Sequence, residues 1–565
     1  MLCYESIIKS VIDCYPELVP EDIQLGTPPA LEMGDVAIPA FIPAKKRKVA
    51  PHVMAQDMAQ RVSFDECVAT ATASGPYLNL FFDRKRVGFA MLRDILLAGD
   101  CWGAGGSGRG KRVLIEHTSI NPNASPHVGR GRCAMIGDSL ARLMRFEGYD
   151  VEVHYYVNDM GRQIGLLVLV ASELEGVTFD RMLDIYVAAN QRAKDDPEFA
   201  ARGYELLVKM EAGDPETREK FYRVTELCLQ GQLEVLRRLN VSYDCFDHES
   251  VYVNDPRWPA IEAALEGRGA IFTDEEGRRV VDLSRLGYGA EEGRYFVLRR
   301  ANGSSMYGCR DLLYSLDKHG RNADINIMVL GEDHKLYAQQ LALILDAAGI
   351  PAPEAIYYSY IRLSQGIMST REGNVVLLSD FLDQASAISQ DRVTEQFPDL
   401  SEDDRRVIAD LVAVSAIRFA VLRVKPAKNV IFDLETALSF NGDTGPYMLY
   451  CCARIRSILR KWDREIPDLS REAFQVTTDQ EWMLLKTMAQ LPKVVSDSMI
   501  QHNCAPIANY ALELAHVFTA FYHECPVLTA DNEATLHMRL RLCEAALQTL
   551  SNALGILGID TPERM

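Results

Sequence analysis

Residues 112–157 hold the pattern that most restricts how this chain can fold. A short apolar strand is predicted at residues 113–115, followed by a polar loop, a helix that Gly148 ends, and a second strand at residues 151–157. This order predicts two parallel strands joined by a right-handed crossover. The buried stripe of the helix is expected to consist of Ile136, Leu140, Leu143 and Met144.

The start of this helix is a candidate phosphate site. His127, Gly129 and Arg130 fall at its N-terminus, where free backbone N–H groups and the positive end of the helix dipole favour an anion. Gly129 would let a ligand approach the backbone closely. Open α/β sheets bind ligands at the carboxyl ends of their strands, which is where this loop lies.

Two segments resemble the signatures of class I aminoacyl-tRNA synthetases. Residues 126–130, Pro-His-Val-Gly-Arg, are similar to the first signature, and residues 368–374, Met-Ser-Thr-Arg-Glu-Gly-Asn, resemble the second. The segments at residues 119–123 and 156–163 resemble arginyl-tRNA synthetases in particular. Two signatures in the correct order carry more weight than either one alone.

The resemblance continues to the end of the chain. Residues 443–450 and 453–459 are similar to the start of the family's helical anticodon-binding domain, and residues 558–565 resemble its carboxyl terminus. From about residue 405 onward the apolar periodicity is helical throughout. The resemblance therefore covers nearly the whole chain.

The expected fold is multidomain α/β. The resemblance implies a small α+β domain at residues 1–100 that contacts tRNA, and a Rossmann-like parallel-sheet catalytic domain at residues 110–400. A helical insertion is expected within it at about 165–300, and an all-α anticodon-binding bundle at residues 401–565. The glycine-rich segment at residues 103–110 is predicted to be a flexible linker, because it precedes a strand instead of following one.

Charge and cysteine content limit the possible partners. The 565 residues carry a net charge of −19, which excludes a protein that coats nucleic acid indiscriminately, so tRNA must be met by a local basic surface. The thirteen cysteines contain no Cys-x-x-Cys pair, so we expect no disulfide framework, no protein-bound metal, and a reducing cytoplasm. The sequence contains no apolar run long enough for a signal peptide or a membrane span.

Amino-acid activation needs donors where negative charge develops. The carboxylate of the amino acid attacks the α-phosphorus of ATP and pyrophosphate leaves, so cationic and N–H groups matter more than a base. Magnesium is expected to accompany ATP, and a closing second-signature loop would exclude water. The resemblance assigns catalysis and ATP binding to His127, Gly129, Arg130, Met368, Ser369 and Arg371.

The sequence departs from the family pattern at several cationic positions. Arg130 replaces the usual second histidine, Ile367 and Thr370 replace lysines of the second signature, and Ala124 stands where many arginyl enzymes have a lysine. An arginine fork suits phosphate geometry well. We expect the missing positive charge to come from Arg130, Arg132 and Arg371.

Selection of arginine requires carboxylates, because an apolar pocket cannot select a guanidinium group. The resemblance offers Glu116 and Asp311 for the guanidinium, Tyr307 for stacking or hydrogen bonding, and Asn121 for the α-amino or carboxylate end. Asp333 occupies another binding position of the family. An alternative for Glu116 is a surface charge beside the strand.

The last domain combines aromatic side chains with arginines, as proteins that bind single-stranded RNA loops do. Tyr447, Arg454 and Arg456 are the candidates for tRNA, while most aromatic residues at helical spacing are expected to be core. The basic segment at residues 44–51 resembles a nuclear localisation cluster. A solvated loop that touches tRNA phosphates is the preferred interpretation.

The resulting hypothesis is an ATP-dependent arginine–tRNA ligase that acts through arginyl-adenylate and releases AMP and pyrophosphate. It is expected to be a cytoplasmic monomer whose partners are tRNA(Arg), L-arginine and ATP. Two alternatives stay open: a paralogue that binds tRNA or arginine without catalysis, and an amino-acid-activating enzyme of specialised metabolism. Arginine-dependent pyrophosphate exchange with and without tRNA separates the three.

Overall fold

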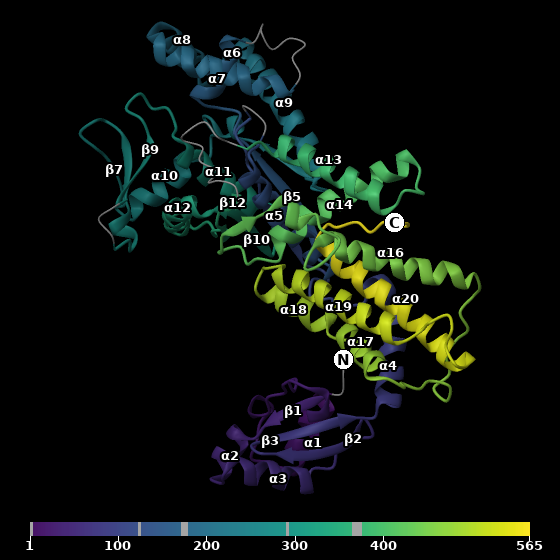
Figure 1. The fold of residues 1–565 in the computed structure, drawn as a ribbon. Helices are drawn as coiled ribbons and strands as arrows, with labels where there is room; N and C mark the ends of the chain where they lie inside the picture. The colour runs from purple at the N-terminus through teal and green to yellow at the C-terminus, as the bar shows by residue number, and fades with distance from the viewer. Residues whose placement is uncertain (1–3, 123–125, 171–178, 290–292, 364–375) are drawn as a thin grey trace.

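The computed structural model describes residues 4–122, 126–170, 179–289, 293–363 and 376–565. Figure 1 shows a small N-terminal domain at the bottom, a bundle of C-terminal helices in the middle, and a domain built around a central sheet above it. The C-terminal helices therefore lie between two regions that precede them in sequence.

The N-terminal domain combines an antiparallel sheet with three helices. Its strands, in sheet order, are β1 (Val36–Pro39), β3 (Tyr77–Phe82) and β2 (Val68–Ser74), and its helices are α1 (Tyr4–Cys14), α2 (Phe41–Arg47) and α3 (Pro51–Arg61). Leu78 and Leu80 of β3 are fully buried in its core. The basic segment at residues 44–51 includes the end of α2, where Lys46 pairs with Asp22 at 2.6 Å.

The N-terminal domain is attached to the rest of the molecule through the C-terminal helices. Helix α4 (Arg84–Ala98) packs against α17 (Asp479–Met488) and α20 (Glu533–Ile556). Asp35, just before β1, accepts hydrogen bonds from Trp482 Nε1 at 2.7 Å and from Lys486 Nζ at 3.1 Å. The buried charge of Asp35 is thereby balanced by Lys486 of α17 across this junction.

The glycine-rich segment at residues 103–110 is fixed in place, so the prediction of a flexible linker was wrong. The buried Glu147 carboxylate accepts hydrogen bonds from the main-chain N–H groups of Gly105 at 2.7 Å and Ser107 at 3.1 Å. The Ser107 hydroxyl donates to the same carboxylate at 2.7 Å. These bonds hold the segment against the carboxyl end of α5 (Val128–Phe146).

The central sheet has the strand order β11–β10–β4–β5–β6, with all neighbours parallel. Its strands are β4 (Arg112–Glu116), β5 (Asp150–Val157), β6 (Cys245–His248), β10 (Ile325–Gly331) and β11 (Glu354–Tyr358). Helix α5 (Val128–Phe146) joins β4 to β5, which confirms the predicted strand, helix and strand.

Helices cover both faces of this sheet. Because side chains alternate along a strand, Tyr155 of β5 enters the core shared with α5, whereas Tyr156 enters a second core. The second core contains residues of α11 (Tyr307–Gly320) and α12 (Lys335–Ala347). Helix α11 therefore lies over the face of the sheet opposite α5.

Insertions separate the strands of the central sheet. The first contains α6 (Arg162–Leu169), α7 (Phe179–Asp195), α8 (Pro197–Glu211) and α9 (Pro215–Arg238). The second contains α10 (Trp258–Gly267) and an antiparallel sheet of β7 (Ile271–Thr273), β8 (Arg279–Asp282) and β9 (Tyr295–Arg299). The segment expected to be helical over about 165–300 is thus helical mainly in its first part. In β9, Phe296 and Leu298 are buried at the period of two that strands require.

The C-terminal region is predominantly helical. Its remaining helices are α13 (Leu378–Gln396), α14 (Glu402–Leu422), α15 (Leu434–Ala437), α16 (Gly445–Trp462), α18 (Leu491–Ile500) and α19 (Ala505–Glu524). One element differs from the expectation of helix throughout: β13 (Val430–Phe432) pairs in parallel with β12 (Ile361–Leu363). Among the described residues, no helix combines the length and apolar character needed to cross a membrane.

One arginine joins several parts of the chain. Arg418 of α14 is fully buried, and its Nη2 lies 2.5 Å from Oδ2 of Asp138 in α5. Its Nε donates to the carbonyl of Leu557 at 2.5 Å, and its Nη1 donates to the carbonyl of Leu239 at 2.6 Å. The segment that follows α20 is therefore connected through Arg418 to the helix that packs on the central sheet.

Candidate active site

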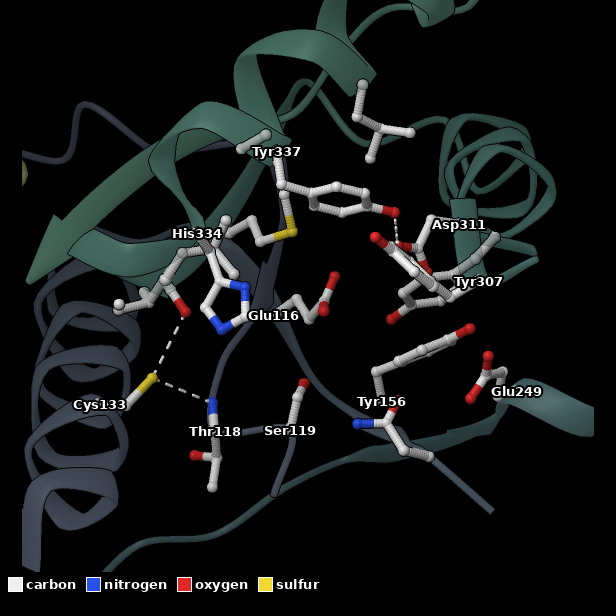
Figure 2. Close-up of a pocket in the computed structure, with 18 of the residues that line it drawn as sticks. Glu116, Thr118, Ser119, Cys133, Tyr156, Glu249, Tyr307, Asp311, His334 and Tyr337 are labelled. Atoms are coloured by element: carbon white, nitrogen blue, oxygen red, sulfur yellow. Dashed lines mark hydrogen bonds between the residues drawn. The ribbon is translucent and has the colours of Figure 1, made fainter. Parts of the chain in front are cut away.

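A cavity of about 540 Å³ opens at the carboxyl ends of β4, β5 and β10. Parallel α/β sheets bind ligands at this edge, so the position agrees with the sequence argument. Figure 2 shows Glu116 of β4, Tyr156 of β5 and Asp311 of α11 around it. The cavity thus lies between the sheet and α11.

Helix α11 supplies one wall of the cavity. Tyr307, Asp311, Tyr314 and Lys318 all line it, at spacings of four, three and four residues. Residues three and four apart share one face of a helix, so these four side chains form a stripe along α11. The sequence singled out the first two, and the structure places them with Glu116 and Asn121 in the same cavity.

Asp311 is the most perturbed carboxyl group of the cavity. Burial, reinforced by the nearby charges of Glu249 and Glu116, raises its pKa from 3.8 to about 7, although the hydrogen bond from the Tyr337 hydroxyl opposes the shift. Figure 2 shows that hydrogen bond. No cation pairs with Asp311 within the described ranges of the chain.

The other two carboxylates of the cavity are paired with cations. Glu249 lies 2.6 Å from Nε of Arg310, and Glu116 lies 2.5 Å from Nζ of Lys318. Glu116 is only 6% exposed, so the alternative of a surface charge beside the strand is wrong. Glu116 faces the cavity, but Lys318 already balances its charge.

The loop after β4 is held in an unusual backbone conformation. Thr118 and Ser119 have φ values of 81° and 43°, which residues with a side chain rarely adopt. The N–H of Thr118 donates to Sγ of Cys133 at 3.3 Å, and its hydroxyl shares a 2.7 Å hydrogen bond with Tyr243. Strain of this kind concentrates at functional sites, because the surrounding structure must enforce it.

Asn121 lies at the mouth of the cavity. Its Oδ1 accepts a hydrogen bond from Nδ2 of Asn158 at 3.0 Å, and its main-chain carbonyl accepts one from Gln232 at 2.9 Å. Both asparagines line the cavity. The bond from Asn158 holds the side-chain amide of Asn121 at the cavity, where its N–H₂ could donate to a polar group of a ligand.

His127 begins α5 with an extended backbone, as a residue preceding a helix does. Burial and the neighbouring Arg130 lower the pKa of His127 to about 4, so its imidazole is neutral at pH 7 and serves as an N–H donor. A Cβ on Gly129 would lie 3.0 Å from the His127 ring, which explains glycine there. Arg130 follows on the first turn and lines the cavity.

The second signature, residues 368–374, lies outside the described residues. Met368, Ser369 and Arg371 belong to it, as does Thr370, and Ile367 directly before it lies outside them too. The residues that follow the second signature are described. The N–H of Val128 donates to the carbonyl of Val376 at 3.2 Å, and the N–H of Leu378 donates to the carbonyl of Pro126 at 2.7 Å. The described residues just after the second signature are thus hydrogen-bonded to those of the first.

Arg132 does not supply phosphate charge, contrary to the expectation from sequence. It is fully buried, and burial lowers its pKa to about 10. Two residues along a helix are about 200° apart around its axis, so Arg132 points away from the side that Arg130 occupies. Its guanidinium donates to the main-chain carbonyls of Ser359, Tyr360, Lys425 and Lys428.

Asp333 is exposed at the rim and is not among the residues that line the cavity. The neighbouring His334 lines it instead, as Figure 2 shows. Asp333 nevertheless lies close enough to His127 to raise its pKa slightly against the effect of burial.

The three candidates for tRNA lie on α16 in different environments. Arg454 stacks between Tyr450 and Tyr522, with its guanidinium carbon 4.7 Å from each ring centroid. The Tyr447 hydroxyl shares a 2.8 Å hydrogen bond with Thr519 of α19. Arg456 holds the segment after α20, because Nη1 donates to the carbonyl of residue 562 at 2.7 Å.

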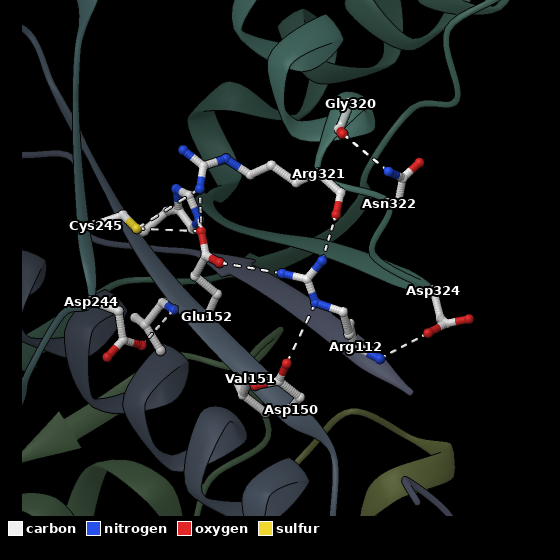
Figure 3. Close-up of polar contacts among 12 residues, drawn as sticks. Arg112, Asp150, Val151, Glu152, Asp244, Cys245, Gly320, Arg321, Asn322 and Asp324 are labelled. Atoms are coloured by element: carbon white, nitrogen blue, oxygen red, sulfur yellow. Dashed lines mark hydrogen bonds and ion pairs between the residues drawn. The ribbon is translucent and has the colours of Figure 1, made fainter. Parts of the chain in front are cut away.

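A cluster of potential metal ligands lies below the cavity, in the central sheet. Glu152, His154 and Cys245 bring their ligand atoms within 4.8 Å of one another. Figure 3 shows Glu152 between two guanidinium groups, those of Arg112 and Arg321. Burial raises the pKa of the Cys245 thiol to about 11, so the thiolate that binds metals is disfavoured. Arg112 and Arg321 already balance the negative charge of Glu152 in this cluster.

Sequence reasoning missed several residues of the cavity wall. Lys318 could have been found from its spacing of seven residues after Asp311, which returns to the same helix face. Tyr156 begins a segment that carries the family resemblance, but no role was assigned to it from the sequence. Glu249 and Tyr337 gave no local signal, because only the folded chain brings their elements together.

Three segments of the chain match known families. Residues 92–434 match the family described as "tRNA synthetases class I (R), catalytic domain", residues 3–82 match "Arginyl tRNA synthetase N terminal domain", and residues 448–565 match "DALR anticodon binding domain". With the parallel sheet and the site at its carboxyl edge, these matches define a class I aminoacyl-tRNA synthetase.

Full-length relatives narrow the class further. The chain is 36% identical over 556 residues to the arginine–tRNA ligase of Methanothermobacter thermautotrophicus, covering 97% of this chain and 96% of that one. It is 37% identical over 536 residues to that of Methanoregula boonei, covering 93% of each. The structure of Thermus thermophilus arginyl-tRNA synthetase superposes with a TM-score of 0.81 at 28% identity, covering 100% of both chains. This chain belongs to the arginyl-tRNA synthetase family.

Proposed function

We propose that this chain ligates L-arginine to tRNA(Arg) using ATP. The arginine carboxylate attacks the α-phosphorus of ATP and pyrophosphate leaves, which forms arginyl-adenylate. A hydroxyl of the terminal tRNA ribose then attacks the carbonyl carbon, and AMP leaves. The first step needs the amino acid beside ATP, and the second needs the terminal ribose of tRNA beside the adenylate.

The single observation that carries this proposal is the Asp311 carboxylate in the cavity beside the start of α5, which has a hydrogen bond from Tyr337 but no cationic partner among the described residues. A guanidinium group is the natural partner of such a carboxylate, because it donates two parallel hydrogen bonds to it. Tyr307, which is half exposed on the same helix face, is placed to cover the guanidinium plane. Glu116 and Asn121 would bind further polar groups of the amino acid.

The α-carboxylate of the amino acid would then point toward the N-terminus of α5. There His127 donates a hydrogen bond as a neutral imidazole, Gly129 leaves the backbone open, and Arg130 provides positive charge. By resemblance, Met368 and Ser369 complete the ATP site and Arg371 adds charge to it. Asp333 is assigned to the rim of the same site.

ATP would be bound as its magnesium complex, with the ion offsetting part of the phosphate charge. Arg454 and Tyr447 are proposed to meet the anticodon arm of tRNA, while Arg456 keeps the segment after α20 in place beside them. The N-terminal domain is proposed as a second tRNA contact. We further propose that the protein is a cytoplasmic monomer.

Pyrophosphate exchange tests the proposal. Exchange that depends on arginine, together with charging of tRNA(Arg), is expected. Exchange without charging would instead indicate an activating enzyme of specialised metabolism, and binding without either activity would indicate a non-catalytic paralogue. The Arg454→Ala variant should raise the KM for tRNA without changing the KM for arginine, whereas an equal change in both would remove Arg454 from the RNA surface.

A further inference from the structure

The far end of α11 carries a buried lysine that contacts the cavity. The side chain of Lys318 is 1% exposed, and its Nζ lies 2.5 Å from Oε2 of Glu116. A buried ammonium group is costly unless it is paired, so this lysine is held by its partners rather than by solvent. Nζ also lies 4.3 Å from the centroid of the Tyr314 ring, as a cation over an aromatic face.

The Tyr314 ring cannot easily turn away from Lys318. Its hydroxyl donates to Oδ2 of Asp247 at 2.9 Å, and its ring stacks on Tyr156 with centroids 4.6 Å apart. Asp247 is in turn hydrogen-bonded to Nδ1 of His154 at 2.5 Å. The ammonium group is therefore confined between a fixed ring and the Glu116 carboxylate.

The charges along this wall form a definite pattern. Three carboxylates line the cavity, and two of them have cationic partners, Glu249 with Arg310 and Glu116 with Lys318. Within the described part of the chain, Asp311 has only the hydroxyl of Tyr337. The wall formed by α11 and β4 thus presents one uncompensated negative charge.

We propose that Lys318 is a positioning residue for arginine selection, which fixes and balances Glu116 so that Asp311 alone offers a free negative charge to the guanidinium group. The proposal rests on the assignment of this cavity to arginine. Lys318 donates to Oε2 of Glu116. This bond fixes the orientation of the carboxylate, so that Oε1 can accept a hydrogen bond from a ligand in a defined direction. Without Lys318, two unpaired carboxylates would face each other across the cavity, and Glu116 would lose its fixed orientation.

A double-mutant cycle tests whether Lys318 acts through Glu116. The full-length variants Lys318→Met, Lys318→Arg, Glu116→Gln and the double variant Lys318→Met/Glu116→Gln are assayed for tRNA charging at saturating tRNA. Lys318→Met should lower kcat/KM for arginine at least about tenfold while the KM for ATP stays within about twofold. Lys318→Arg should recover most of this loss, because it restores the cation.

The double variant gives the decisive result. The amide that Glu116→Gln introduces has no charge to balance, so removing the lysine as well should leave arginine kcat/KM no lower than in Glu116→Gln alone. Losses that simply multiply in the double variant would overturn the proposal, because Lys318 would then act independently of Glu116. Equal rises in the KM values for arginine and ATP in Lys318→Met would overturn it too, as the sign of a general structural defect.

Lys486→Met is a matched control. Lys486 is also part of a largely buried ion pair, with Asp35 at 3.1 Å, but it lies between α17 and the N-terminal domain. Its loss should lower the melting temperature and leave arginine kcat/KM near that of the unchanged protein. A similar selective loss in this variant would count against a specific role for Lys318.

The same set of variants separates this inference from the proposed function. If Glu116→Gln weakens arginine use but Lys318→Met does not, the lysine inference is wrong and the cavity assignment survives. If both Glu116→Gln and Asp311→Asn leave arginine kcat/KM unchanged, the cavity assignment is wrong and the inference falls with it.

Discussion

Replacing Asp311 by asparagine removes the free charge of the cavity and keeps its shape. Asp311 meets no cation among the described residues, so a bound guanidinium would be its only charged partner. Loss of a charge-assisted pair in a desolvated pocket costs about 2–5 kcal/mol, which corresponds to roughly 30- to 5000-fold in arginine kcat/KM. ATP binding should change little, because Asp311 lies on the opposite side of the cavity from α5.

The same substitution should stabilise the protein without ligand. Burial raises the pKa of Asp311 from 3.8 to about 7, which corresponds to roughly 4 kcal/mol of unfavourable charging. Asp311 is only half-buried, so water in the cavity reduces the expected gain to about 2–4 kcal/mol. Below pH 4 the carboxyl group is protonated in both folded and unfolded chains. Between about pH 4 and 7 only the unfolded chain ionises, so the folded protein loses stability as pH rises.

Charging kinetics and thermal unfolding together decide the matter. Asp311→Asn should lose arginine kcat/KM, gain melting temperature at pH 8, and match the unchanged protein at pH 4. Citrulline, which is neutral and nearly isosteric with arginine, should gain relative to arginine in the variant. Unchanged discrimination between arginine and citrulline would refute the pocket, and a variant that is less stable at pH 8 would refute the electrostatic argument.

Three further outcomes are expected. In the unchanged protein the KM for arginine should rise as pH falls through about 7, because Asp311 takes up a proton there. His127, whose pKa is about 4, stays neutral over this range. The pH dependence of the KM should therefore vanish in Asp311→Asn. Arg130→Ala should slow activation by at least about tenfold in pyrophosphate exchange, with Arg130→His retaining more activity; near-normal rates for both would make Arg130 a surface charge. Arg418→Met removes one of the two arginines that pair with the buried Asp138 and leaves Arg142 as its partner, so the free energy of unfolding should fall by about 1–3 kcal/mol in denaturant titration; a smaller loss in the double variant with Asp138→Leu would identify the lost Arg418–Asp138 pair as the cause.

Strands β4 and β5 of the central sheet were predictable because they are short apolar runs next to polar loops. Nearly every residue of β4 is buried, so the sequence shows it plainly. The short strand β13 was missed because its partner β12 lies some 70 residues earlier, and three residues give too little period to see. The glycine-rich segment was misread for a similar reason, since its stability comes from a carboxylate some 40 residues away.

The candidate site could be predicted where its side chains share one face of a helix. Tyr307 and Asp311 came from the family resemblance, and the structure adds Lys318 further along the same face of α11. Its spacing places it on that face, but a lysine on a helix is normally solvated, so the sequence does not show that this one is buried. Arg132 was expected to bind phosphate but does not. Because it lies two residues after Arg130 on the helix, it points toward main-chain carbonyls instead of the ligand.

The bond between Arg418 and Leu557 makes the order of synthesis matter. Domains near the N-terminus generally fold while the ribosome still adds later residues. Here Asp138 on α5 pairs with Arg418, which is made later, and Arg418 in turn donates to the carbonyl of Leu557, which lies 139 residues further along the chain. In a chain that stops before Leu557, Nε of Arg418 lacks this acceptor, although the bonds of Arg418 to Leu239 and Asp138 are available. We therefore expect the contacts around Arg418 to be complete only after Leu557 has been made. Residues that carry no catalytic group thus decide when, during synthesis, these contacts are completed.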